Sequence, residues 1–160
     1  MIAVTLLSVG KLKENYLREG VAEYAKRLAK FCTFDSIEVA DVKIPDDPSP
    51  AEAAKVLETE GAAILARLPK NTLVIALAVE GGPLSSPAFA DLIGEAANRG
   101  TSRICFVIGG SLGLSEAVKH ASDRLLSFSP MTFPHQLMRL LFIEQLYRAF
   151  TILHHQTYHK

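Results

Sequence analysis

The stretch that decides the fold is L-V-I-A-L-A-V, residues Leu73–Val79, which is apolar at every position. A strand that is apolar on both of its faces is typical of a parallel sheet covered by helices on both sides. We therefore predict that this strand lies in the centre of such a sheet. A second apolar run, I-C-F-V-I at Ile104–Ile108, predicts another buried strand.

Patterns typical of strands and helices alternate along the rest of the chain. The other predicted strands are Ile2–Val9, Phe34–Val42 and Asp123–Ser129. The predicted helices are Asn15–Phe31, Ala51–Leu68, Ser86–Asn98, Ser115–Ala121 and Pro134–Leu153. Strands separated by helices predict an α/β fold, with a mainly parallel sheet and helices on both faces. A chain of 160 residues with 49% hydrophobic content predicts one domain, spanning residues 1–160.

Local signals predict where several elements begin and end. The segment Glu80–Pro83 should end the central strand, because glycine and proline both weaken a strand interior. Pro134 suits the first turn of the last helix, and Thr132 is placed to cap it. The apolar side chains of this helix cover more of its circumference than one core-facing stripe needs. A partner subunit is the simplest cover for its second side.

The overall charge of the chain limits how it can bind partners. Seventeen Lys and Arg residues balance seventeen Asp and Glu residues. This balance excludes a strongly basic protein that holds nucleic acid by bulk charge alone. The segments Lys11–Lys30 and His135–Lys160 are locally basic, so we expect contact with an anionic partner there.

Cysteine usage and the N-terminal segment predict a cytoplasmic protein. Cys32 and Cys105 lack C-x-x-C spacing and lie in apolar contexts, which is typical of buried thiols in a reducing compartment. The segment M-I-A-V-T-L-L-S-V-G has no positive region before its apolar residues, unlike a signal peptide. No apolar run approaches the roughly 20 residues that a membrane span needs, so we expect no membrane partner.

Three loops that follow predicted strands mark a candidate ligand pocket: Leu77–Gly82, Gly109–Gly113 and Phe128–Phe133. Parallel sheets bind ligands beyond the carboxyl ends of their strands. The chain has neither G-x-G-x-x-G spacing nor a Walker lysine, which favours a nucleoside ligand without phosphates. The paired glycines Gly109 and Gly110 would let such a ligand approach the backbone closely. The alternative is that this loop is only a tight turn.

Ionisable residues gather in the last helix and the tail that follows it. Glu144 and Arg148 are spaced as i and i+4, and so are His135 and Arg139. A surface ion pair is the default explanation for Glu144 and Arg148. Both pairs interrupt an apolar helix, however, so Glu144 and Arg148 should be half-buried and either paired or hydrogen-bonded. His155 and His159 would share a helix face, but the lack of a fourth ligand disfavours a metal site. A frayed polar tail is the plain alternative.

Three motifs together resemble the family of ribosomal large-subunit pseudouridine methyltransferases, in the SPOUT class. They are F-V-I-G-G-S-L-G-L-S at 106–115, S-F-S-P-M-T-F-P-H-Q-L-M-R at 127–139, and E-Q-L-Y-R-A-F-T-I at 144–152. The resemblance spans the whole chain, which ends in Y-H-K. It implies a C-terminal trefoil knot, a homodimer, and S-adenosyl-L-methionine as cofactor. It also implies methylation of N3 of a pseudouridine in large-subunit ribosomal RNA on the assembled ribosome, with no DNA partner.

The resemblance also implies the site residues. The cofactor-binding set would be Leu77, Gly109, Gly110, Phe128, Ser129, Pro130, Met131, Thr132 and Phe133. The catalytic set would be Glu144, Arg148, His135, Tyr158 and His159. N3 of the base carries a proton, so a base or charge stabiliser is needed; which of these side chains removes that proton is open. Gly81-Gly82-Pro83 departs from the more usual G-K of the family, which puts any phosphate role of that loop in doubt.

Two other functions compete with this prediction. One is a dimeric ribosome- or RNA-binding protein without catalysis, in which the tail serves only for docking. The other is a small-nucleotide hydrolase, which would need an acidic cluster for Mg²⁺ that the sequence lacks.

Overall fold

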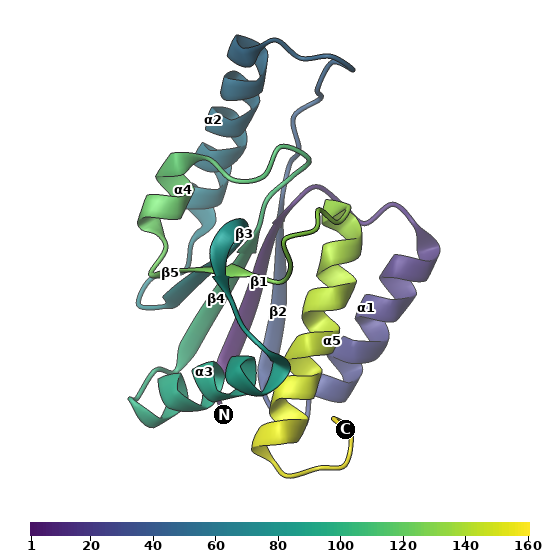
Figure 1. The fold of residues 1–160 in the computed structure, drawn as a ribbon, viewed down its shortest axis with the longest axis vertical. Helices are drawn as coiled ribbons and strands as arrows, with labels where there is room; N and C mark the ends of the chain where they lie inside the picture. Colours follow the sequence, from purple (N-terminus) through teal and green to yellow (C-terminus); the bar gives the residue numbers. More distant parts are fainter.

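The computed structural model describes all 160 residues and contains a five-stranded sheet with helices on both faces (Figure 1). The strands are β1 (Ala3–Val9), β2 (Thr33–Val39), β3 (Leu73–Pro83), β4 (Arg103–Ile108) and β5 (Arg124–Ser127). The helices are α1 (Asn15–Leu28), α2 (Pro50–Arg67), α3 (Ser86–Asn98), α4 (Glu116–Ala121) and α5 (His135–Leu153). The strand order is β2-β1-β4-β3-β5, and every neighbouring pair is parallel. The predicted parallel α/β fold is therefore confirmed.

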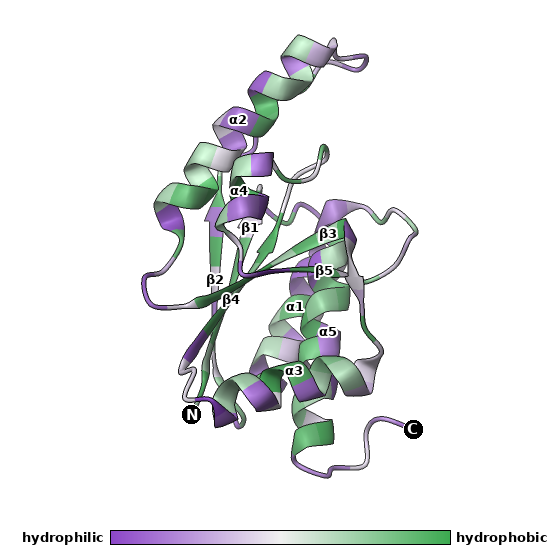
Figure 2. Cartoon of the chain, turned by 60° about the vertical axis from the view of Figure 1, so that its left-hand side comes forward, coloured by the Kyte–Doolittle hydropathy of each residue, from purple (hydrophilic) through white to green (hydrophobic).

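The sheet separates two hydrophobic cores. Helices α1, α3 and α5 cover one face, while α2 and α4 cover the other (Figure 2). Phe142 and Leu146 of α5 are fully buried in the first core, and Ile64 of α2 and Val118 of α4 are buried in the second. The middle strand is β4 rather than β3, so the prediction that Leu73–Val79 lies at the centre is wrong by one position. Strand β3 still has a neighbouring strand on each side and helices over both faces, which explains its apolar sequence.

Two glycines allow neighbouring helices to pack closely on α5. A Cβ atom on Gly20 of α1 would lie 2.9 Å from a methyl carbon of Leu140, and one on Gly94 of α3 would lie 2.8 Å from a methyl carbon of Leu153. Helices α1 and α3 therefore cover both flanks of α5 within the same chain. The wide apolar circumference of α5 thus has an intramolecular explanation, and it does not by itself require a partner subunit.

Most predicted helix starts agree with the structure. Ser49 caps α2 in a reciprocal capping box with Glu52, and Ser115 caps α4. The predicted cap of α5 is wrong, because its N-cap residue is Pro134 and no side chain caps it. Thr132 lies two residues before the N-cap, too far back to accept a bond from the first helical amides.

The segment Glu80–Pro83 does not end β3, contrary to the prediction. Leu126 of β5 pairs with Leu77 and, across a shift in register, with Gly82 as well. The second half of β3 therefore curls around β5, and a Cβ atom on Gly81 would lie 2.7 Å from the backbone of Leu126. Only glycine permits so close an approach. This wrapping is consistent with the trefoil knot that the family resemblance implies.

Cys32 and Cys105 are free and buried, as the sequence predicted. Burial raises the pKa of the Cys32 thiol to about 11 and that of Cys105 to about 12, so both thiols stay protonated. None of the five helices combines the length and the apolar character that crossing a membrane requires.

Candidate functional site

A cavity of about 340 Å³ lies where the carboxyl ends of β3, β4 and β5 meet. These strands are neighbours in the sheet, which is why their three following loops converge. Eight of the nine residues predicted to bind the cofactor line this cavity, and Pro130 is the exception; the eight are Leu77, Gly109, Gly110, Phe128, Ser129, Met131, Thr132 and Phe133. A cavity of this size lies within the range of small-molecule sites. We call it the first cavity.

The wall of the first cavity is mainly apolar or uncharged. Ile108, Leu114, Leu126 and Met138 contribute apolar surface beside the backbone of the two loops. The only lysine on the wall is Lys119, and it is already paired with carboxylates of Glu80 and Glu116. The charge of Lys119 is therefore balanced by two carboxylates, so the wall carries no excess positive charge for a phosphate group, which fits a nucleoside without phosphates.

Lys119 and Glu80 are site residues that the sequence reasoning did not identify. The hydrogen bond with Glu80 raises the pKa of Lys119, and the same bond lowers the pKa of Glu80. Glu80 belongs to the curled part of β3 and Lys119 to α4, so the pair joins two elements across the cavity. No local pattern could have shown this contact, because the two residues meet only after β3 has folded around β5.

Packing inside the protein requires both glycines of the β4 loop. A Cβ atom on Gly109 would collide with the carbonyl oxygen of Gly113, and one on Gly110 would lie 2.9 Å from Oε1 of Glu60. Both atoms would point into the protein. A larger side chain at Gly110 would therefore disturb the core behind the loop, so its effect on ligand binding could not be separated from its effect on folding.

A second cavity of about 230 Å³ adjoins the first. The two share Leu126, Ser127, Phe128 and Phe133 as a common wall. The second cavity is also lined by Glu144 and Gln145 of α5 and by Ser86 of α3. It therefore places ionisable and amide groups beside the first cavity.

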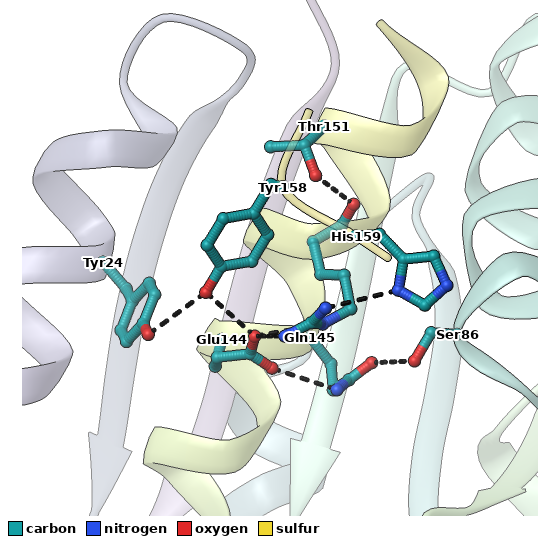
Figure 3. A network of polar contacts seen from close by, with 8 residues as sticks. Tyr24, Ser86, Glu144, Gln145, Thr151, Tyr158 and His159 are labelled. Atoms are coloured by element: carbon teal, nitrogen blue, oxygen red, sulfur yellow. Dashed lines mark hydrogen bonds and ion pairs between the residues drawn. The ribbon is translucent and has the colours of Figure 1, made fainter. Parts of the chain in front are cut away.

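Glu144 is the centre of a polar network that links α5 to the tail (Figure 3). Its Oε1 atom accepts hydrogen bonds from Nη2 of Arg148 at 2.5 Å and from the Tyr158 hydroxyl at 3.1 Å. Nη1 of Arg148 lies 3.2 Å from Nδ1 of His159. The structure thus brings together four of the five predicted catalytic residues, and Glu144 and Arg148 are paired and partly buried as expected.

Gln145 and Ser86 extend this network to α3, although the sequence reasoning did not identify them. Nε2 of Gln145 donates to Oε2 of Glu144 at 3.0 Å, and the Ser86 hydroxyl donates to Oε1 of Gln145 at 2.7 Å. Both oxygens of Glu144 are therefore occupied by donors. This arrangement holds the carboxylate in one orientation.

The tail is docked at Tyr158 rather than frayed. The Tyr158 ring lies edge-on to Tyr147 with the ring centres 4.9 Å apart, and the Arg148 guanidinium lies 4.8 Å from its centre. Its hydroxyl lies 3.4 Å from that of Tyr24 in α1. Burial, and then the contacts with Tyr24 and Glu144, raise the pKa of Tyr158, so it stays a neutral donor.

The helix ends before the two histidines that were expected to share one of its faces. Helix α5 ends at Leu153, and His155 has a positive φ of 52°. His155 and His159 therefore do not follow each other by one helical turn. The prediction that these two histidines share a helix face, on which the metal-site alternative depended, is therefore wrong.

His135 lies apart from the network, on the wall of the first cavity. It is nine residues before Glu144, or roughly 13 Å along the helix axis. Burial lowers the pKa of His135; Arg139 and Lys13 lower it further, while Asp41 opposes them. Its imidazole is therefore neutral and able to accept a proton near neutral pH.

Arg139 has a structural role that its spacing from His135 did not reveal. Its buried guanidinium donates to the backbone oxygens of Val9 and Gly10 at 2.6 Å each, and to Oε2 of Glu38 at 2.7 Å. Arg139 therefore ties α5 to the end of β1. No hydrogen bond joins it to His135.

Comparison with known proteins identifies the family. The model described as "Predicted SPOUT methyltransferase" matches residues 2–159. The chain belongs to the SPOUT methyltransferase family. This SPOUT methyltransferase is 53% identical over 157 residues to a protein named "Ribosomal RNA large subunit methyltransferase H" from Streptococcus thermophilus (strain CNRZ 1066), covering 98% of this chain and 99% of that protein. Proteins of the same name from Carboxydothermus hydrogenoformans and Bacillus pumilus are 51% and 50% identical with the same coverage.

A solved structure supports the fold of this SPOUT methyltransferase. A probable methyltransferase from Bordetella pertussis Tohama I superimposes with a TM-score of 0.55 at 17% identity, covering 92% of this chain and 95% of that one. At this identity the likeness concerns the fold alone. The family and its relatives favour methyl transfer over the ribosome-docking and hydrolase alternatives.

Proposed function

We propose that this SPOUT methyltransferase transfers a methyl group from S-adenosyl-L-methionine to N3 of a pseudouridine in large-subunit ribosomal RNA. The substrate is the assembled ribosome, and the enzyme is a cytoplasmic homodimer built from one domain per chain. The observation that carries the proposal is the first cavity, which has no excess positive charge for a phosphate and adjoins a second cavity lined by Glu144 and Gln145. The names of the close relatives support the class of RNA.

The first cavity suits the proposed cofactor. Its apolar side chains, such as Leu77 and Phe133, would surround the adenine ring, while the backbone of Gly109–Gly113 would contact the ribose. The cofactor supplies an electrophilic methyl group attached to a sulfonium. The chain's own contribution is to hold that group next to the second cavity, where the base would enter.

His135 is the proposed acceptor of the proton from N3. It is the only member of the catalytic set on the wall of the first cavity, and its lowered pKa keeps the imidazole neutral. Glu144 suits a different role, because both of its oxygens already accept hydrogen bonds. It positions Arg148 and Tyr158, and Arg148 stabilises the negative charge that develops on the uracil ring.

The charge balance of the chain is compatible with a ribosomal substrate. A chain with seventeen basic and seventeen acidic residues cannot hold RNA by bulk charge. On the ribosome, shape and local contacts with a large composite surface can supply affinity and register instead. The homodimer is tested separately by sedimentation, where a stable and active monomer would contradict it.

The test of the function is methyl transfer from methyl-labelled S-adenosyl-L-methionine to ribosomes from cells that lack this activity. We expect label in one pseudouridine of the large-subunit RNA, and far less label in free RNA. Thr59→Ala, at an exposed position of α2 outside both basic segments, serves as a control variant and should retain full activity. Absence of label from ribosomes would refute the proposed reaction. Equal labelling of free RNA would refute the assembled ribosome as the substrate.

A further inference from the structure

The first cavity has one pair of oppositely charged side chains. The rest of its wall carries no charge, because His135 is neutral. Glu80 and Lys119 both line the cavity and are paired with each other. The side chain of Lys119 is 17% exposed and that of Glu80 is 53% exposed. Glu80 is therefore open to solvent, and the pair forms the charged part of a wall that is otherwise apolar or uncharged.

Neither partner of the pair has used its full hydrogen-bonding capacity. The ammonium group of Lys119 has three donors, and two of them are directed at Glu80 and Glu116. Glu80 binds Lys119 through Oε1, and no other side chain donates to its carboxylate. A ligand with its own cation and anion can therefore bind to the pair without breaking it.

An α-amino acid group has this chemistry, because it carries an ammonium and a carboxylate on the same carbon. In the proposed cofactor that group is attached through sulfur to a neutral adenosine. The apolar part of the cavity suits the adenosine, and the charged end suits the amino acid. Hydrogen bonds between charged partners are shorter and stronger than those between neutral ones, so they fix the orientation of the ligand in the cavity.

We infer that Lys119 binds the carboxylate and Glu80 binds the ammonium of the amino acid group of the methyl donor. The pair is a specificity-determining element of the cofactor site. This inference rests on the proposed function, because it takes the methyl donor to be S-adenosyl-L-methionine. It predicts that the enzyme distinguishes ligands by the presence of the amino acid group.

The experiment compares two ligands by calorimetric titration. S-adenosylhomocysteine carries the amino acid group, whereas 5′-methylthioadenosine has the same adenosine and sulfur without it. Lys119→Met should weaken binding of S-adenosylhomocysteine by about tenfold or more, as expected for the loss of a hydrogen bond between charged groups. Binding of 5′-methylthioadenosine should change by less than about twofold.

Three further variants complete the design. Glu80→Gln should show the same selective loss, and Lys119→Arg should retain most of the discrimination because it retains the charge. Glu116→Gln removes the other partner of Lys119 but does not line the cavity, so it should leave both affinities unchanged. Thermal unfolding of each variant checks that the fold is retained.

The outcomes separate this inference from the proposed function. If wild-type protein binds neither ligand, the proposed function fails and this inference fails with it. If wild-type protein binds both ligands, and the Lys119 and Glu80 variants weaken both equally or neither, the cofactor site stands and the inference is overturned. Selective loss in only one of the Lys119 and Glu80 variants would also overturn it, because the inference requires both partners to bind the amino acid group.

Discussion

The hydroxyl of Tyr158 lies 3.1 Å from Oε1 of Glu144, so the tail is bonded to the middle of α5. The same carboxylate holds Arg148, whose other side contacts His159. A residue near the end of the chain thus helps to fix the orientation of an arginine in the proposed active site. The first cavity does not depend on this contact, because none of these residues lies on its wall.

Tyr158→Phe should separate this positioning role from cofactor binding. The variant retains the ring packed on Tyr147 but loses the hydroxyl contacts with Glu144 and Tyr24. We expect methyl transfer to fall by at least about tenfold and stability to fall by about 0.5–1.5 kcal/mol, the usual value for one hydrogen bond. Affinity for S-adenosylhomocysteine should not change. Thr59→Val, which also removes one hydroxyl at an exposed position of α2, is the matched control.

A truncation that ends at Thr157 should lose methyl transfer by orders of magnitude while it still binds cofactor. The Tyr158 ring is docked rather than frayed, so the truncation should also cost stability. Loss of the contacts with Tyr147 and Arg148 should lower the free energy of unfolding by about 1–2 kcal/mol. Urea denaturation measures this cost, and wild-type turnover by the truncated protein would remove the tail from the active site.

His135→Asn should change the pH dependence of the reaction. Burial, Arg139 and Lys13 lower the pKa of His135 against the opposing effect of Asp41, so the wild-type imidazole remains a base below the ordinary histidine range. Wild-type activity should therefore persist below about pH 6.5. The variant should react about 100-fold or more slowly. Its rate should also lack the fall at acid pH that protonation of His135 causes in the wild type. His120→Asn, at an exposed position of α4, should match wild type.

The same lowered pKa predicts a direction for stability. The unfolded chain binds a proton at His135 more readily than the folded protein does. The stability that depends on the neutral imidazole is therefore present above the ordinary histidine pKa, and it is lost as the pH falls through the lowered folded value. In His135→Asn, the free energy of unfolding should fall less on acidification, because this contribution of the imidazole is absent. An unchanged pH dependence of unfolding would contradict the assigned environment.

Glu60→Gln should stabilise the protein at neutral and alkaline pH. Glu60 is 3% exposed; its Oε2 atom accepts a bond from the Val42 amide, and its Oε1 atom has no partner. Burial, with a contribution from Asp41, raises the pKa of Glu60. The stability that protonated Glu60 contributes to the fold is present at acid pH, and it is lost as the pH rises through that raised pKa. Glutamine stays neutral, so its advantage in thermal unfolding should appear at pH 8 and shrink toward about pH 4.

Arg139→Met should destabilise the fold. The substitution leaves the backbone oxygens of Val9 and Gly10 without their buried donor. Each unsatisfied buried group costs about 1–3 kcal/mol, so we expect a loss of about 3 kcal/mol in the free energy of unfolding. Glu38→Gln removes only the half-exposed partner and should cost far less. Equal effects of the two substitutions would contradict this role of Arg139.

Local patterns in the sequence determined the class of fold and the position of the first cavity. The apolar run at Leu73–Val79 records burial on both faces, and burial on both faces is a property of strands in parallel α/β sheets. The loops after such strands must lie at one edge of the sheet, so their convergence could be predicted without knowing the strand order. The pairing of Glu144 with Arg148 could also be predicted, because residues spaced as i and i+4 on one helix are neighbours.

The tertiary structure decided the contacts between segments that are distant in the chain. The curl of β3 around β5 brings Glu80 to Lys119, and the docking of the tail brings Tyr158 to Glu144. Arg139 bonds to β1 rather than to its neighbour His135, because the buried oxygens at the end of β1 require a donor. Sequence periodicity records which face of an element is buried. It does not record which distant element covers that face, since this depends on the path of the whole chain.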